Sequence, residues 1–142
     1  MGKLITTSLS PAQVNALYSG AAVQLEIVKA PGANKFIKVN SVTIGLNAGS
    51  AAFTGGGVLT VEYTGGSVNA LGASATFPVT TITNGGTLTD LVSTKFATTA
   101  TTAVVLPTVN CGISISNATA AFAGGTGANV VVVVDIDTVT VA

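Results

Sequence analysis

The chain has 142 residues, the length of one domain, and only 7% of them are charged, where an average soluble domain has about 25%. Five lysines balance five acidic residues, and arginine and histidine are absent. This composition excludes a basic patch for nucleic acid and most histidine-dependent catalysis and metal binding. The longest aliphatic run, Val130 to Val134, is far shorter than the roughly 20 residues of a membrane helix, so we expect no membrane partner. A net charge near zero favours self-association.

The first nine residues, Met1 to Leu9, are predicted to form an extended arm that orders only against a partner or the edge of the domain. Because free arms order when they find an edge to pair with, Lys3, Leu4 and Ile5 are the residues expected to contact a partner. Residues 10–142 are predicted to form a single domain. No basic segment followed by an apolar stretch marks a secretory signal, so the chain is expected to fold in the cytoplasm where it is made.

A short helix is predicted at the start of the domain. Ser10 is a good N-cap, Pro11 suits the first helical position, and Gln13 is placed to complete a capping box. Val14 and Leu17 then share one face, and Gly20 follows as a stop signal. The pattern predicts one helix of about two turns.

Alternating apolar residues indicate that strands follow the helix. Residues 23–28 and 35–46 both show the period of two that is typical of half-buried strands. The chain is expected to reverse at the turn residues 30–34 between them, which predicts a first hairpin. The inward positions of the second strand shift by one residue, which predicts a β-bulge near Asn40 and Ser41. A loop at 47–57 and a strand from Leu59 to Tyr63 predict a second hairpin with a wide tip.

The second half of the chain is less regular until its end. Strands are predicted at residues 75–82, 103–106 and 111–116, and residues 87–96 are expected to form a helical turn. The run Val130 to Ile136 is predicted to be a strand, and we expect this strand to be central because Val130 to Val134 is apolar on both faces.

One internal repeat is visible, because Asn47 to Gly56 resembles Asn117 to Gly125 with one residue deleted. Each copy is flanked by predicted strands, which indicates two equivalent hairpins and two related halves. Together the elements predict an all-β fold, a jelly-roll-like β-sandwich of about eight strands with one short N-terminal helix.

The residues offer little chemistry, and we predict no catalytic, cofactor or metal site. Glu26 and Glu62 are formally an acid–base pair for glycoside cleavage, but their outward strand positions favour a solvated face. Asp135 and Asp137 suit a hard cation such as calcium, but also a solvated strand end. The single cysteine, Cys111, lies in an alternating apolar run and is expected to be a small buried residue.

Two glycine-rich segments, 55–57 and 124–127, are followed by strands and lack the lysine of a P-loop, so they are predicted to be loop tips.

The order of parts in residues 10–64 carries a resemblance. These parts are a Ser-Pro-capped helix, a strand, the turn Ala30-Pro31-Gly32-Ala33-Asn34, a long strand, the loop Ala51-Ala52-Phe53-Thr54-Gly55-Gly56-Gly57 and the strand Leu59-Thr60-Val61-Glu62-Tyr63. This order resembles small virion structural proteins of tailed phages, in particular head decoration (cement) proteins, and residues 109–136 resemble them more loosely. The resemblance implies a non-enzymatic subunit, often a homotrimer, that binds the major capsid protein on the outside of the capsid and clamps neighbouring capsomers.

Three other classes of protein compete with this interpretation. A tail or fibre component would share the composition, although long fibres usually carry many short repeats. A glycan-binding jelly roll would need aromatic residues at loop tips, and Phe53 and Phe122 are the candidates, although their matched positions favour core plugs. An enzyme is disfavoured by the residue inventory.

Overall fold

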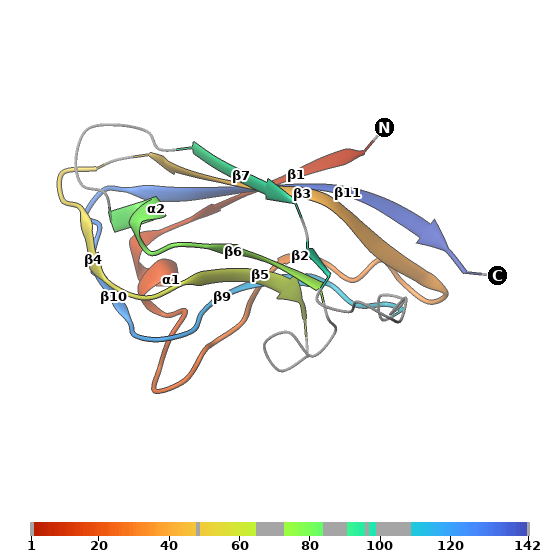
Figure 1. Cartoon of the computed structure of the whole chain (residues 1–142), viewed down its shortest axis with the longest axis horizontal. Helices are drawn as coiled ribbons and strands as arrows, with labels where there is room; N and C mark the ends of the chain where they lie inside the picture. Colours follow the sequence, from red (N-terminus) through yellow and green to blue (C-terminus); the bar gives the residue numbers. More distant parts are fainter. Residues whose placement is uncertain are drawn as a thin grey trace.

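The computed structural model describes residues 2–47, 49–64, 73–83, 91–95, 97–98 and 109–141. Within these residues, eleven strands and two short helices form a sandwich of two antiparallel sheets, with a two-stranded ribbon at one end (Figure 1). The predicted all-β sandwich is therefore confirmed.

The first sheet has four strands in the order β1-β11-β3-β7. Its strands are β1 (Lys3–Leu9), β11 (Asn129–Thr140), β3 (Lys35–Asn47) and β7 (Leu91–Lys95). The valine-rich strand β11 pairs with β1 on one side and β3 on the other, as its apolar run predicted.

The second sheet has five strands in the order β2-β9-β5-β6-β8. Its strands are β2 (Leu25–Val28), β9 (Ile113–Asn117), β5 (Leu59–Tyr63), β6 (Ala73–Phe77) and the two-residue β8 (Ala97–Thr98). Every pairing within both sheets is antiparallel.

The core lies between the two sheets, where the alternating pattern points one apolar face of each strand inward. Its most deeply buried side chains include Val42, Ile44, Val61, Ile113, Ile115 and Val132. Burying each of these contributes on the order of 1.5–3 kcal/mol. Tyr63 joins the two sheets directly, because its hydroxyl donates to the carbonyl oxygen of Ile37 at 2.7 Å.

The predicted β-bulge is confirmed at the expected place. Ser41 is opposite Asp135 in the neighbouring strand, but Val39 is opposite Ile136, so Asn40 is the extra residue. The bulge keeps apolar residues inward on both sides of the shift.

The helix α1 (Pro11–Asn15) begins with the predicted capping box. The Gln13 backbone N–H donates to Ser10 Oγ at 3.3 Å, and the Ser10 N–H donates to Gln13 Oε1 at 2.9 Å. The helix is shorter than expected, because Ala16 already acts as the C-cap, ahead of the glycine stop at Gly20. Neither helix in the described part of the chain is long and apolar enough to cross a bilayer.

Two predictions for the middle of the chain are wrong. The strand predicted at 75–82 ends at Phe77, since Pro78 has no N–H for a sheet ladder, and α2 (Thr80–Thr83) follows. The helical turn predicted over 87–96 is instead strand β7 at residues 91–95, which pairs with β3. Its β-branched residues suit a strand. The strand predicted at 103–106 lies outside the described residues.

The three predicted hairpins, around residues 30–34, 47–57 and 117–125, are also wrong, because the two long strands that flank each of these segments lie in different sheets; for the third segment these are β9 and β11. β2 and β5 belong to the second sheet, whereas β3, which lies between them in the chain, belongs to the first. Crossing between sheets lets the apolar faces of successive strands point into the same interior. The alternation of apolar residues predicts each strand. It does not show whether a strand pairs with its neighbour in the sequence or belongs to the opposite sheet.

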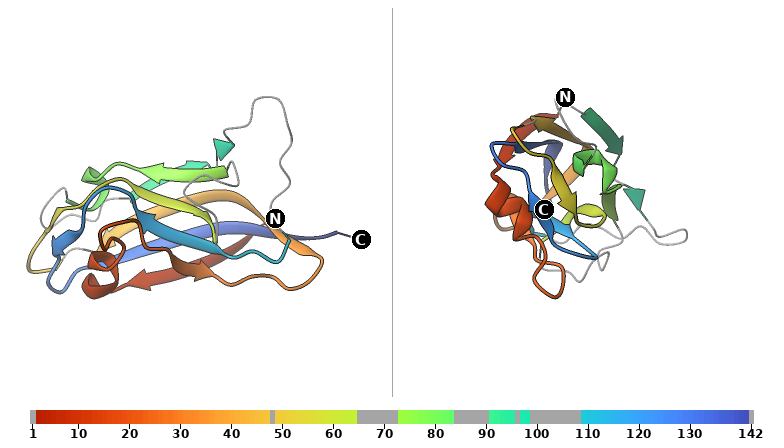
Figure 2. Two further views of the ribbon diagram at one scale, coloured as in Figure 1. Left: turned by 90° about the horizontal axis from the view of Figure 1, so that it is seen from below. Right: turned by 90° about the vertical axis from the view of Figure 1, so that its left-hand side faces the viewer.

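The two repeated segments cross between the sheets at the same end and pair with each other. β4 (Phe53–Gly55) lies antiparallel to β10 (Phe122–Gly124). The contacts are reciprocal: Gly56 N–H donates to Ala121 O at 3.1 Å, and Gly125 N–H donates to Ala52 O at 3.0 Å. Seen end-on in Figure 2, α1 and α2 flank this ribbon, in contact with β10 and β4 respectively.

The two aromatic rings of the repeat fill the interior of this end. Phe53 and Phe122 meet edge to face with ring centroids 6.3 Å apart, and both are buried. Each ring also lies against a glycine of the other segment, so that a Cβ on Gly56 would fall 2.1 Å from the Phe122 ring and one on Gly125 would fall 2.3 Å from the Phe53 ring. The predicted core-plug role of both rings is confirmed.

Candidate functional site

Of the segment expected to be an arm, Met1 to Leu9, the residues Lys3–Leu9 lie along the edge of the domain as β1. It pairs with β11 from Lys3 to Leu9, and Leu9 is buried in the core. The strand leaves the core toward its N-terminal end, where Leu4 is 66% exposed. Deleting the whole segment would therefore remove a strand of the sheet.

The three residues predicted to contact a partner are divided between the two faces of β1. Lys3 and Ile5 face the space between the two sheets, whereas Leu4 faces outward, because side chains alternate along a strand. Lys3 and Ile5 help to line a pocket of about 360 Å³.

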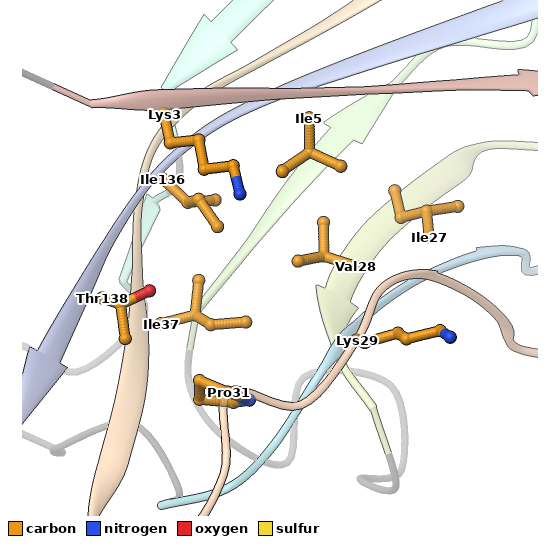
Figure 3. A pocket seen from close by; sticks show the side chains of 9 residues that line it. All are labelled: Lys3, Ile5, Ile27, Val28, Lys29, Pro31, Ile37, Ile136 and Thr138. Atoms are coloured by element: carbon orange, nitrogen blue, oxygen red, sulfur yellow. The ribbon is translucent and has the colours of Figure 1, made fainter.

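This pocket lies between β1 and β2 (Figure 3). Its wall is aliphatic and is formed by residues that continue the core outward. The complete lining is Lys3, Ile5, Ile27, Val28, Lys29, Pro31, Ile37, Ile136 and Thr138. Sequence reasoning found only two of these residues, because the pocket arises from strands that are distant in the chain.

The pocket ends where the two strands are joined by a side chain. Thr7 Oγ1 donates to the carbonyl oxygen of Ile27 at 3.2 Å. Thr7 is the next inward position after Ile5, so this bond closes the gap between the sheets on the core side of the pocket. We call the gap between β1 and β2, from Lys3 to this bond, the seam.

Glu26 and Glu62 lie on the outer face of the five-stranded sheet, with one strand between them. Both are opposite Ser114 of β9, so their backbones are roughly 10 Å apart, or two strand spacings. Glu26 is exposed as predicted, but Glu62 is only 3% exposed, and the prediction of a solvated side chain is wrong for it. The Gln24 side chain, which reaches across the sheet and donates to Glu62 Oε1 at 3.0 Å, covers this carboxylate. This burial leaves little room for a sugar ring at Glu62.

Asp135 and Asp137 share the bulge residue as a hydrogen-bond donor. Asn40 Nδ2 lies 3.5 Å from Asp135 Oδ1 and 3.0 Å from Asp137 Oδ2. Both carboxylates are half-buried. Among the residues that the structure describes, no group of three or more acidic, histidine or cysteine side chains is placed to hold a metal ion.

Cys111 is buried, as its alternating run predicted. Its thiol donates to the carbonyl oxygen of Thr64 at 2.7 Å. Burial raises the pKa of the Cys111 thiol, and the nearby Glu26 carboxylate raises it further. A raised pKa keeps the sulfur as an unreactive thiol.

The glycine-rich segments are turns rather than phosphate cradles. Gly55, Gly56, Gly124 and Gly125 all have positive φ and follow or end the short strands of the ribbon. No helix begins directly after either segment, so the amide groups and dipole of a phosphate-binding helix are missing here.

No family model, curated protein or solved structure matches the chain.

Proposed function

We propose that this chain is a non-enzymatic virion structural protein, a decoration subunit that binds the major capsid protein on the outside of a phage head and stabilises the shell. The observation that carries the proposal is the nearly uncharged surface of a β-sandwich, since only 7% of the residues are charged. Such a surface is suited to burial against other protein surfaces.

Part of the outer face of the four-stranded sheet, which excludes Asp135, Asp137 and the bulge beside them, illustrates this surface. Across its centre, Thr6 is opposite Val133, and Val133 is opposite Thr43. Val131 and Val133 are half-buried in the single chain, and Thr6 and Ser8 are exposed. We infer that copies of the chain associate through charge-poor faces of this kind, and that the assembly is a homotrimer.

The strand order supports the inference that the sandwich is a jelly roll. Without the ribbon and β8, the described residues form eight strands. Numbered in chain order, strands one, eight, three and six form the first sheet, and strands two, seven, four and five form the second. Two interlocked Greek keys produce such an alternation between sheets. The jelly roll is an architecture of viral capsid proteins and lectins, so it agrees with the proposed role.

A tail or fibre component is the first alternative. The internal repeat has only two copies, and these pair with each other at one end of the sandwich instead of forming a linear array. This arrangement favours a compact subunit over a fibre.

A glycan-binding module is the second alternative. Phe53 and Phe122 are buried, as are Tyr63 and Phe77, so they offer no ring for stacking on a sugar. In the described residues only Tyr18 and Phe36 are half-exposed aromatics.

Co-sedimentation of the purified chain with heads that lack it tests the proposal, with light scattering to measure its own oligomeric state. We expect saturable binding by a stable trimer. A stable oligomer that ignores heads would instead favour the tail or the glycan-binding role.

Salt dependence tests the binding mechanism. Because attachment is expected to rely on apolar burial and backbone hydrogen bonds, about 1 M NaCl should leave the protein on intact heads, although it screens exposed ion pairs. Release at this salt concentration would contradict this mechanism.

A further inference from the structure

The seam combines an open strand edge with an extension of the core. β1 is the terminal strand of the first sheet and β2 is the terminal strand of the second. In the described residues, no strand pairs with the outer edge of β1. Such an edge presents unpaired N–H and C=O groups, which are a template for an added strand.

The pocket beside this edge is suited to an apolar side chain. Its volume of about 360 Å³ is at the lower end of the range for ligand sites. Ile5, Ile27 and Ile37 approach it from three different strands (Figure 3). Covering these side chains would complete the core at this end.

The charge at the pocket is positive. Lys3 is an inward position of β1, and its ammonium group points toward the centre of the pocket in Figure 3. Lys29 also lines the pocket, although its ammonium group points away from the other lining residues in Figure 3, and none of the nine lining residues is acidic. An occupant with a carboxylate would complement these charges.

We propose that the seam binds an extended segment of the capsid subunit, a proposal that rests on the head-binding function proposed above. The segment adds a strand along the outer edge of β1, inserts one aliphatic side chain into the pocket and places a carboxylate beside Lys3. The strand edge favours a polypeptide over a free alkyl carboxylate, because an alkyl chain cannot satisfy the backbone groups of β1.

Three substitutions test this site with heads that lack the protein. Ile5→Trp fills the pocket and Lys3→Glu reverses its charge. Ala12→Glu is the control, because it introduces a glutamate at an exposed position of α1, at the ribbon end of the sandwich. We expect Ile5→Trp to abolish attachment, Lys3→Glu to weaken it roughly threefold to fivefold, and Ala12→Glu to leave it within about twofold of the wild type. Light scattering on each variant checks the oligomer.

If the wild type binds heads and all three variants bind equally well, the seam is not the contact, whereas the decoration role remains. If Ile5→Trp dissociates the oligomer, the seam is a contact between copies of this chain, and the proposed occupant is wrong.

A synthetic peptide tests the seam independently of heads. The probe is acetyl-Thr-Val-Thr-Ile-Thr-Asp-amide, titrated at millimolar concentration while backbone amide NMR signals are recorded. We expect shifts at Lys3 to Ile5 and at Ile27 to Lys29, loss of these shifts in Ile5→Trp, and roughly threefold to fivefold weaker binding when lysine replaces the aspartate of the peptide.

The peptide result separates failure of the site from failure of the function. Localised shifts without head binding would support the seam as a strand-binding site while contradicting the decoration role. Shifts that occur with octanoate but not with the peptide would overturn the proposal in favour of a small alkyl carboxylate, and so would the absence of shifts with either probe.

Discussion

The two ends of the sandwich differ in how completely side chains fill the interior. At the ribbon end, Phe53 and Phe122 fill the interior, and each ring lies against a glycine of the other segment. At the seam, Ile5 and Ile37 border an unfilled pocket, and a lysine takes the outermost inward position. Stability is therefore concentrated at the ribbon end, whereas the seam keeps apolar surface available for a partner.

The largest expected effect comes from adding one methyl group at the ribbon end. In Gly125→Ala the new Cβ would lie 2.3 Å from the Phe53 ring, at a residue whose φ is +75°. Overpacking and left-handed strain together should lower the free energy of unfolding by roughly 3–5 kcal/mol. Urea denaturation measures this loss.

Gly20→Ala is the matched control, because φ is +74° there and no atom lies within 4 Å of the added Cβ. This substitution should lower the free energy of unfolding by only about 1–2 kcal/mol, because only the left-handed backbone conformation disfavours alanine there. Equal losses in the two variants would show that the ring contact contributes nothing.

Tyr63→Phe removes the hydroxyl that joins the two sheets between these ends. Losing its 2.7 Å hydrogen bond to Ile37 O should cost about 1–2 kcal/mol, because the carbonyl is left buried. Urea denaturation at neutral pH measures the loss. A change below about 0.5 kcal/mol would contradict the importance of this link.

The same residue predicts a pH dependence. Burial raises the pKa of Tyr63 from 10.0 to about 12, so the folded state disfavours the phenolate. The stabilisation from this hydroxyl should be complete below pH 10.0 and should be lost as pH rises toward about 12. The difference in unfolding free energy between wild type and Tyr63→Phe should shrink over this range, and a constant difference would contradict the raised pKa.

Features that depend on neighbouring residues in the sequence could be predicted. The capping box at Ser10, the bulge at Asn40 and the central valine strand all leave a local pattern. The choice of sheet for each strand leaves no such pattern, because a strand buries the same face whichever neighbour it pairs with. The predictions of hairpins are wrong for this reason. The burial of Glu62 beneath Gln24 likewise leaves no local pattern in the sequence.

The pocket of the seam could likewise be predicted only in part from the sequence. The alternation of Lys3, Leu4 and Ile5 is visible in the sequence, but the other walls of the pocket come from residues more than twenty positions away. The repeat predicted a relation between Phe53 and Phe122 but not that the two segments pair.

A smaller effect is expected at the side-chain bond that closes the seam. Thr7→Val removes the 3.2 Å hydrogen bond to Ile27 O while keeping the shape of the side chain, at a cost of about 0.5–1.5 kcal/mol. Amide hydrogen exchange should become faster along β1 in particular, because the bond ties this edge strand to the other sheet. Thr6→Val, on the exposed face of the same strand, should not change the exchange rates. Equal rates in both variants would mean that the bond does not hold the edge.

The smallest effect should come from the largest added side chain, Ile5→Trp in the seam. The indole would enter an existing pocket of about 360 Å³, and the Lys3 stem can move aside toward water. The free energy of unfolding should therefore stay within about 1 kcal/mol of the wild type, measured by urea denaturation. A single methyl at Gly125 would then cost several times more than an indole at Ile5, because the ribbon end is filled by aromatic rings and the seam is not. A loss as large as that of Gly125→Ala would mean that the seam is as tightly packed as the ribbon end, and the contrast between the two ends would be wrong.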